Sequence, residues 1–433
     1  MSNYDFVKLN QLCLKITDGS HYSPKGIIEG IPMLSVKDML DNRFSYNDCK
    51  FISTSDYLDL VRSDCKPLVN DLVIAKDGSY LKYVFVIKEE IDQAILSSIG
   101  ILRPNLKKII PEYLKYYLQT KSVKETVAKK YVSGSALPRI ILKNFGEIDV
   151  VYTNILNQQK IASILTSLDS KIEVNNRINT ELEAMAKTLY DYWFVQFDFP
   201  NKERKSYKNS GGKMVWNEEL KREVPEGWKV GELKEIANII MGQSPPGESY
   251  NEDGEGMIFY QGCTDFGNRF PTVRKYTTQP TRFAKEGDIL LSVRAPVGTL
   301  NIAKEDCCIG RGLAALNSKD NCIAYLFGVM VNLKQVFDRR NVDGTTFGSI
   351  TKDDLFSLNV IRPDKDILKQ YHNIISPAFE KQNQIALENQ QLSSLRDWLL
   401  PMLMNGQVRP LAPKGEQEME RLMAAEPRVE YGK

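Results

Sequence analysis

The chain has 433 residues, of which 42% are hydrophobic and 26% are charged. This composition is typical of soluble globular proteins and excludes a fibrous or wholly disordered chain, while the length predicts two or more domains. The formal net charge is only +2, so any affinity for nucleic acid must come from local patches.

The start of the chain, MSNYDFVKLNQ, lacks the charged and apolar regions of a signal peptide, and the longest near-apolar run, 323–333, is too short to cross a bilayer. We therefore expect a cytoplasmic protein. The cysteines have no C-x-x-C spacing, which predicts free thiols rather than disulfides or a zinc site. They are Cys13, Cys49, Cys65, Cys263, Cys307, Cys308 and Cys322.

Residues 1–150 are predicted to form a β-rich module with accessory helices. Runs such as 71–75 and 83–87 are rich in β-branched residues and are bounded by Gly, Pro, Asn or Asp, as short strands are. A similar run at 288–293 indicates a second module of this kind over residues 228–361.

Residues 151–199 are predicted to contain the first long helix. Apolar residues recur at multiples of seven from Ile161 to Leu189, between polar residues, with Asn175 at the centre of the series. A polar residue at such a position sets the register of a coiled coil at some cost in stability. At about 1.5 Å per residue, a helix over 154–194 is a rod of about 60 Å.

Residues 200–227 combine a charge run with Ser-Gly-Gly and Pro, which predicts an exposed linker and a domain boundary near Trp228. The second long helix is expected over residues 362–405, followed by a C-terminal tail at 406–433. The residues predicted to form the interface of the two helices are Ile161, Leu168, Leu182, Leu189, Ile385, Leu392 and Leu399.

An internal repeat relates the two halves of the chain. Shifted by 210 residues, the sequence aligns with itself without a gap, pairing Gly134 with Gly344 and Leu189 with Leu399. Upstream the likeness is looser, and 30–44 resembles 256–270. We therefore predict an α+β fold in which two β-rich modules alternate with two long helices. The helices would pair as an antiparallel coiled coil, giving a pseudo-two-fold internal repeat.

The sequence contains no convincing catalytic or metal site. Ser244-Pro245-Pro246 resembles the start of an amino-methyltransferase motif, but Gly247 stands where a ring would stack on a flipped base. Gly310-Arg311-Gly312 favours a tight turn over a nucleotide-binding loop, and no P-loop motif is present. His21 and His372, the only histidines, have no recognisable Ser, Cys or metal-ligand companion.

If the chain binds DNA, recognition would fall to polar loop residues in both modules. Arg and Lys can bind guanine or phosphate, Gln can pair with adenine, and Gly-Ser or Gly-Thr loops can present backbone N–H groups to phosphates. Each candidate can also be an ordinary surface residue. In the first module the candidates are Ser20, His21, Tyr22, Lys76, Tyr80, Ser133, Ser135 and Arg139. In the second they are Gln243, Ser244, Arg269, Arg294, Arg311, Thr345, Thr346 and Lys352.

Four segments, together with the alternation of modules and helices, point to a family. They are 158–194, Gly211-Gly212-Lys213-Met214-Val215-Trp216, Pro225-Glu226-Gly227-Trp228 and 396–406. With them the chain resembles type I restriction-modification specificity subunits over nearly its whole length. The likeness weakens only in the tail after Arg409.

The resemblance implies that each module is a target recognition domain for one half of a bipartite, asymmetric site on double-stranded DNA. The helices would be spacer and docking platform. In this family two modification subunits methylate adenine with S-adenosylmethionine, and restriction subunits translocate DNA with ATP and cut it. The chain itself would be non-catalytic, with S-adenosylmethionine, ATP and Mg bound only by the partner subunits.

Three other readings stay open on the sequence. The chain could be a stand-alone DNA methyltransferase or nuclease, against which the missing aromatic after Pro246 counts. It could be a coiled-coil adaptor without DNA contact, although an adaptor would not need two large, divergent modules. It could also guide modification in a system that has no nuclease.

Overall fold

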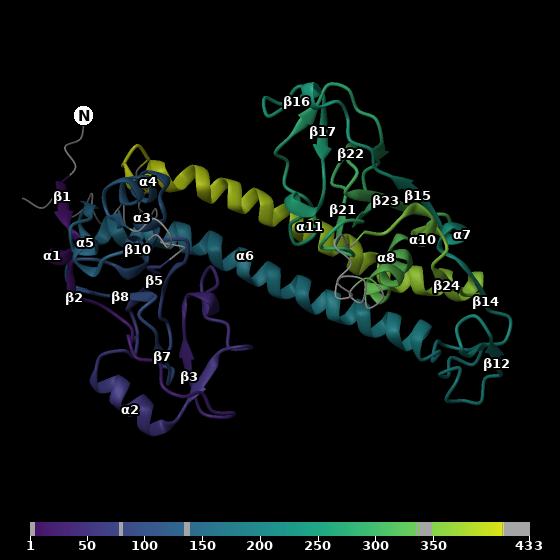
Figure 1. Ribbon diagram of the computed structural model, residues 1–433, viewed down its shortest axis with the longest axis horizontal. Helices are drawn as coiled ribbons and strands as arrows, with labels where there is room; N and C mark the ends of the chain where they lie inside the picture. Colours follow the sequence, from purple (N-terminus) through teal and green to yellow (C-terminus); the bar gives the residue numbers. More distant parts are fainter. Residues whose placement is uncertain are drawn as a thin grey trace, which may run out of the picture. The chain divides into compact units, whose positions relative to one another are not determined.

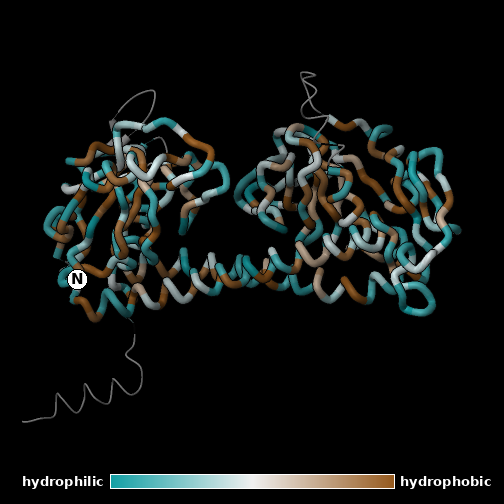
Figure 2. The backbone as a smooth tube through the Cα atoms, turned by 90° about the horizontal axis from the view of Figure 1, so that it is seen from below, coloured by the Kyte–Doolittle hydropathy of each residue, from teal (hydrophilic) through white to brown (hydrophobic). Residues whose placement is uncertain are grey.

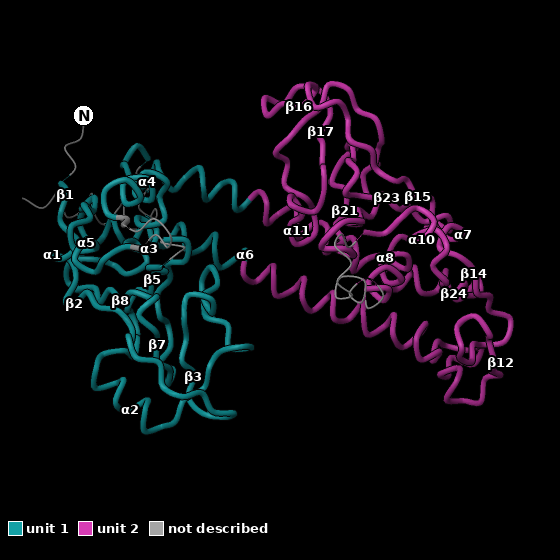
Figure 3. The backbone as a smooth tube through the Cα atoms, viewed as in Figure 1, with its two compact units in different colours: residues 1–172, 392–433 teal, residues 173–391 magenta. Residues whose placement is uncertain are grey.

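The computed structural model describes residues 5–77, 81–133, 139–334, 337, 349–408 and 410 (Figure 1). For residues 132, 133 and 139 the description is limited to the backbone. The chain forms two compact units. Unit 1 comprises residues 1–172 and 392–433, and unit 2 comprises residues 173–391 (Figure 3). Each unit contains one module together with part of both long helices.

Unit 1 is built on a four-stranded antiparallel sheet in the order β2-β8-β5-β6. A second sheet has the order β4-β3-β7, with β3 and β7 parallel, and the pairs β1-β11 and β9-β10 complete the unit. The strands are β1 (Asp5–Lys8), β2 (Cys13–Asp18), β3 (Ile31–Leu34), β4 (Lys50–Ile52), β5 (Leu72–Ala75), β6 (Val84–Val86), β7 (Ala94–Ile95), β8 (Ile99–Pro104), β9 (Val132–Ser133), β10 (Arg139–Ile140) and β11 (Asp149–Tyr152). The helices of the module are α1 (Leu9–Leu12), α2 (Thr54–Arg62), α3 (Pro111–Gln119), α4 (Lys121–Lys130) and α5 (Leu142–Gly146).

Unit 2 repeats this plan with the four-stranded antiparallel sheet β15-β23-β20-β21 and the pair β14-β24. Its second sheet is larger, β16-β18-β17-β22-β19, and again contains one parallel pair, β17 and β22. The strands are β14 (Lys229–Glu232), β15 (Ala237–Met241), β16 (Tyr250–Asn251), β17 (Met257–Tyr260), β18 (Tyr276–Thr277), β19 (Phe283–Ala284), β20 (Ile289–Ser292), β21 (Leu300–Ile302), β22 (Cys307–Ile309), β23 (Leu313–Ser318) and β24 (Asn359–Arg362). The helices are α7 (Leu233–Ile236), α8 (Ile323–Asn332) and α10 (Lys352–Phe356).

The central strand of each unit is buried on both faces, which explains its continuous apolar sequence. In unit 1, Leu72 and Ile74 of β5 belong to the cluster that includes the helices, whereas Val73 and Ala75 face the second sheet. In unit 2, Ile289 and Leu291 alternate with Leu290 in the same way. The brown, hydrophobic stretches inside each module follow this core (Figure 2).

The two long helices are α6 (Ile155–Tyr190), which ends in a π-helical turn at Asp191–Val195, and α11 (Lys365–Met404). In unit 2, the Asn175 amide nitrogen donates to Asn389 Oδ1 (2.9 Å), and Trp193 packs on Tyr371 with ring centroids 5.7 Å apart. As the residue number rises along α6 it falls along α11, so the helices run antiparallel there. In unit 1, Arg396 donates to Asp169 (2.9 Å), which continues the same order.

The predicted α+β fold with an internal repeat and paired antiparallel helices is therefore confirmed. Of the residues predicted at the helix interface, Ile161 and Ile385 are buried, and Asn175 is 1% exposed. The other predicted interface residues are half-buried, namely Leu168, Leu182, Leu189, Leu392 and Leu399.

The predicted linker over residues 200–227 requires a correction. It contains a hairpin of β12 (Met214–Asn217) and β13 (Arg222–Pro225), and Val224 is buried in the core of unit 2. Phe199 stacks on Tyr207 and on Trp228, with ring centroids 4.6 and 4.7 Å apart. The charge run obscured these aromatic residues, which anchor the segment to unit 2.

Three smaller predictions concern the whole chain. All seven cysteines are free thiols, as their spacing predicted. Over the residues that the structure describes, no helix combines the length and the apolarity needed to cross a membrane. Within the same residues, no group of three or more His, Cys, Asp or Glu side chains is placed to hold a metal ion.

Candidate nucleic-acid interface

Three loops of unit 2 meet at one edge of its sheets. They follow β15, β17 and β22, and backbone hydrogen bonds join them. Gly242 N donates to Leu313 O (2.9 Å), Gly310 N to Tyr260 O (2.8 Å) and Gly312 N to Gln261 O (3.1 Å). Residues far apart in the sequence thus form one rigid surface, which we call the loop edge of unit 2 and which comprises residues 242–244, 261–262, 293–294 and 310–312.

The loops approach so closely that glycine is required where they touch. A Cβ atom on Gly242 would lie 2.1 Å from Gly310 O. A Cβ atom on Gly310 would lie 2.9 Å from Gln261 Cα, and one on Gly312 would lie 2.6 Å from Gln261 O. Cβ atoms essentially never approach other atoms so closely, so Gly310-Arg311-Gly312 is a close-packed turn, as expected.

The end of β20 joins the same edge. Val293 N donates to Gly312 O (2.9 Å), and Ile350 N donates to Val293 O (2.9 Å). Arg294 forms an antiparallel bridge with Ser349, close to the start of α10. Sequence prediction selected Arg294 and Lys352 separately, and the structure brings the segments that contain them together.

The loop edge of unit 2 presents polar side chains. Gln243, Arg294 and Arg311 are exposed, and Ser244 is half-exposed. In the part of the chain that the structure describes, neither guanidinium group is hydrogen bonded or ion-paired. Free cations and amides on a rigid edge can bind phosphate oxygens and base edges.

Gln261 is a member of this edge that the sequence did not reveal. It is exposed, and the Ser244 hydroxyl lies 3.1 Å from its Oε1 and 3.0 Å from its Nε2. The Arg311 backbone N–H also donates to Ser244 Oγ, at 3.5 Å. The only sequence signal was the loose repeat upstream of residue 270, which does not show that loops 17 residues apart touch.

Unit 1 builds an equivalent edge, with backbone hydrogen bonds that match most of those in unit 2. Ser20 N donates to Ile95 O (2.8 Å) where Gln243 N donates to Ile309 O (3.0 Å), and Leu96 N donates to Leu34 O (2.8 Å). Lys76 N donates to Ser98 O (2.9 Å), and Ile140 N to Lys76 O (3.2 Å). The framework is therefore repeated. The side chains on it differ, with Ser20, Ser35, Asp77 and Ser97 standing where unit 2 has Gln243, Gln261, Arg294 and Arg311.

Two of the first module's candidates are exposed among those whose side chains the structure describes. His21 and Tyr22 are exposed, and His21 Nε2 lies 3.5 Å from Asp18 Oδ2. Ser20 is buried, and its hydroxyl donates to Tyr22 O (2.6 Å). Tyr80 and Ser135 lie outside the described residues, and Ser133 and Arg139 are described only as the backbone of β9 and β10.

Lys76 is a correction to the predicted set. It is 7% exposed, and its ammonium group donates to Asp18 Oδ2 at 2.6 Å. A lysine that is buried and paired in this way does not present its charge to a phosphate. The sequence placed it in a loop, but tertiary packing against β2 buries it.

Arg269 is the second correction. It is 6% exposed, its Nε donates to Asn383 Oδ1 (2.5 Å), and its guanidinium lies 4.2 Å from the centroid of the Phe379 ring. Burial lowers its pKa to about 10, although Glu183 opposes this shift. Arg269 therefore joins the module to α11 instead of facing solvent. Lys352 is exposed at the start of α10, and Thr345 and Thr346 lie outside the described residues.

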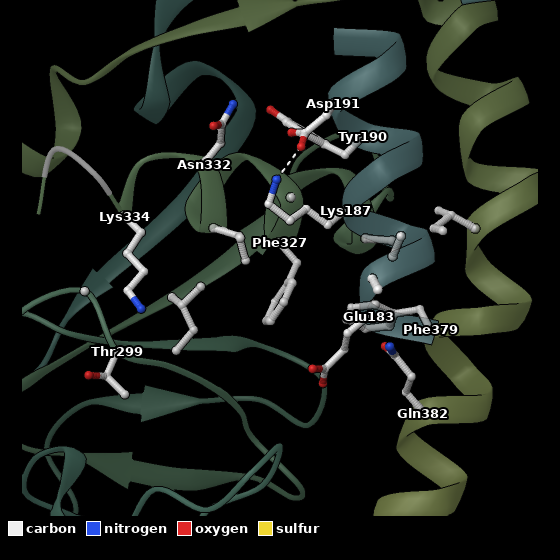
Figure 4. Close-up of a pocket in the computed structure, with 18 of the residues that line it drawn as sticks. Glu183, Lys187, Tyr190, Asp191, Thr299, Phe327, Asn332, Lys334, Phe379 and Gln382 are labelled. Atoms are coloured by element: carbon white, nitrogen blue, oxygen red, sulfur yellow. Dashed lines mark hydrogen bonds and ion pairs between the residues drawn. The ribbon is translucent and has the colours of Figure 1, made fainter. Parts of the chain in front are cut away.

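Unit 2 also contains a cavity of about 770 Å³ between α6, α8 and α11 (Figure 4). Its lining is mostly apolar. Figure 4 shows Glu183 beside Phe379, and Lys187 paired with Asp191. Desolvation raises the pKa of Glu183. Among the described residues that line the cavity there is no Ser, Cys or His.

Comparison with known proteins identifies the family. Residues 1–184 and 225–396 match the family described as "Type I restriction modification DNA specificity domain". The putative type I restriction enzyme MjaX specificity subunit of Methanocaldococcus jannaschii is 33% identical over 316 residues, which cover 71% of this chain and 71% of that protein. The HindI specificity subunit of Haemophilus influenzae is 22% identical, covering 87% of this chain and 94% of that protein.

A solved structure has the same fold. The S subunit of a type I restriction-modification system from M. genitalium matches with a TM-score of 0.58 at 17% identity, covering 95% of this chain and 98% of that one. The family match extends over both modules and most of both long helices. The chain therefore belongs to the type I restriction-modification specificity subunit family.

Proposed function

We propose that the chain is the DNA-recognition subunit of a type I restriction-modification complex. Residues 1–150 and residues 228–361 each read one half of a bipartite, asymmetric site on double-stranded DNA. One observation carries this proposal: the two modules share most of the backbone hydrogen bonds at their loop edges but differ in the side chains placed there. A constant framework with different polar groups suits two modules that read different sequences.

We further propose that the chain catalyses no reaction itself. Its loop edge in unit 2 offers amide, hydroxyl and guanidinium groups, which recognise bases and phosphates but do not transfer a methyl group or cut a strand. Methyl transfer and cleavage would belong to the modification and restriction subunits. The complex would act in the cytoplasm, where it meets DNA.

The long helices would hold the modification subunits. In unit 2, α6 and the π-helical turn that follows it carry an exposed apolar stripe at helical spacing, which consists of Val174, Ile178, Met185 and Tyr192. In unit 1, α11 exposes Leu395 and Trp398, and Leu395 is the repeat equivalent of Met185. Two equivalent apolar surfaces on one chain fit two copies of one partner.

Co-expression with a modification subunit tests the proposal. The chain and the partner are produced together in cells that lack other adenine methylation, and methyladenine is mapped over the genome. We expect one motif with two separated half-sites, and no methylation when the chain is omitted. A single uninterrupted motif, or methylation by the chain alone, would overturn the proposed function.

A further inference from the structure

Ser244 and Gln261 form a closed pair at the loop edge of unit 2. The Ser244 hydroxyl lies about equally far from both heteroatoms of the Gln261 amide, 3.1 Å from Oε1 and 3.0 Å from Nε2. It can donate to the amide oxygen and accept from the amide nitrogen at the same time. A third contact from Arg311 N, at 3.5 Å, uses the remaining lone pair of the hydroxyl.

We infer that Gln261 is a specificity-determining residue that reads one adenine, and that Ser244 holds its place until DNA binds. This inference rests on the proposed function of the module. In the free protein, the hydroxyl offers the amide one donor and one acceptor. In the major groove, adenine offers the same combination through N6–H and N7.

The other three bases do not offer the Gln261 amide both a donor and an acceptor, as the Ser244 hydroxyl does. Guanine presents two acceptors, cytosine presents a donor without an adjacent acceptor, and thymine presents an acceptor beside a methyl group. Each of them would leave one amide atom without a partner once Ser244 moved aside. The pair thus penalises every base except adenine, because a buried polar group without a hydrogen bond is unfavourable.

The surroundings support contact with DNA at this point. Gln261 is exposed, and its backbone carbonyl is held by Gly312 N (3.1 Å), so the side chain starts from a fixed position. Arg311 and Arg294 are exposed on the same edge and can hold phosphates beside the base. The Ser244 side chain can rotate away from Gln261, because Ser244 is half-exposed and lies in a loop, where water can replace its hydrogen bonds.

The test uses the assembled complex with its modification subunit and maps methyladenine for each variant. With Gln261→Ala, we expect the preference for adenine at one position of the second half-site to fall by about 5- to 150-fold. The other half-site should keep its sequence. With Gln261→Glu, which can only accept, the preferred base at that position should change from adenine to cytosine.

Two further variants separate the roles. Ser244→Ala removes the hydroxyl that binds the Gln261 amide in the free protein but keeps Gln261 itself. The requirement for adenine should therefore persist. Gln196→Ala is the matched control, because Gln196 is an exposed glutamine of unit 2 that follows the end of α6. It should leave the motif unchanged.

Several results would overturn the inference. One is a Gln261→Ala complex that assembles and still requires the same bases. Another is a loss of the adenine requirement with Ser244→Ala, which would show that Ser244 and not Gln261 contacts the base. Complete loss of methylation by both Gln261 variants in an assembled complex would also exclude a single base contact. Failure of the proposed function looks different, because the unmodified complex would then show no bipartite motif.

Discussion

Asp18 and Lys76 form a buried ion pair in unit 1, with 2.6 Å between Oδ2 and Nζ, at positions where unit 2 has Met241 and Val293. The repeated framework therefore accepts either a charged pair or two apolar side chains at this point. Breaking a buried pair leaves one charge without compensation, whereas replacing both charges with apolar groups is often neutral.

We therefore predict opposite outcomes for single and double substitutions. Lys76→Val should lower the free energy of unfolding by about 3–5 kcal/mol, because Asp18 would keep a buried charge. Asp18→Met combined with Lys76→Val should recover most of that loss. Denaturant unfolding measures both. If the double variant were as unstable as the sum of the two single variants, the equivalence with Met241 and Val293 would be wrong.

A second prediction concerns Asp169 in unit 1, which accepts hydrogen bonds from Lys115 Nζ (3.1 Å), Tyr116 (2.7 Å) and Arg396 (2.9 Å). Desolvation raises its pKa, but these partners outweigh it and hold the pKa below the usual 3.8. A carboxylate with a lowered pKa stabilises the fold above pH 3.8, and this contribution is lost as the pH falls through the folded pKa.

Asp169→Asn should therefore destabilise the protein at pH 7 by about 3 kcal/mol, and the difference from the unmodified chain should shrink below pH 3.8. Unfolding measured at pH 7 and pH 3 checks this. Asp59→Asn is the control, because Asp59 forms an exposed pair with Arg62, and this substitution should change stability by less than about 1 kcal/mol. An effect of Asp169→Asn that did not vary with pH would contradict the assignment.

The two isoleucines Ile385 and Ile374 test the helix pairing within unit 2. Ile385 is 2% exposed and Ile374 is 52% exposed, although both lie on α11. Ile385→Asp should destabilise the protein by several kcal/mol, at least about 3, because an unpaired charge would enter an apolar interface. Ile374→Asp should change it by less than about 1 kcal/mol. Equal melting temperatures for both variants would show that no such interface exists.

The fold followed from periodicity, but the individual contacts did not. Heptad spacing and the 210-residue repeat depend on local sequence, so they revealed both helices and their pairing. Arg269 and Arg311 looked alike as loop arginines beside small or polar residues. Packing against Phe379 of α11 buries Arg269, whereas Arg311 is exposed. Burial of this kind depends on residues more than 100 positions away.

Gln261 was missed for a related reason. Its role depends on contact with Ser244 and Gly310, which the sheet topology brings together, and neither neighbour forms a motif with it. The charged residues of 200–227 also led to a wrong prediction for this segment, because they outnumber Val224 and Tyr207, which pack on the core of unit 2. Spacing alone therefore locates modules and helices, while base-reading side chains require the tertiary structure.

The apolar stripe on the helices provides the fourth prediction. Met185→Asp and Leu395→Asp each place a charge on one of two equivalent exposed surfaces. Each should therefore remove one of two bound modification subunits, and the double variant should remove both. Native mass spectrometry of the co-expressed complex counts the subunits. Ile28→Asp is the control, because Ile28 is 94% exposed in the first module. Unchanged stoichiometry in the double variant would place docking elsewhere.

The last prediction separates the reading of the two half-sites. If each module reads one half-site, replacing residues 1–150 with the equivalent module of a related protein should change one half of the methylated motif only. The second half-site should stay intact because the loop edge of unit 2 is held by its own hydrogen bonds, such as Gly310 N to Tyr260 O. Extending α6 and α11 by one heptad each should instead lengthen the spacer by about 10 Å, or about three base pairs. Methyladenine mapping of both chimeras measures the outcome. A module exchange that altered both half-sites together would show that recognition is not divided between the modules. A helix extension that changed the preferred bases would show that the helices do more than set the distance between the half-sites.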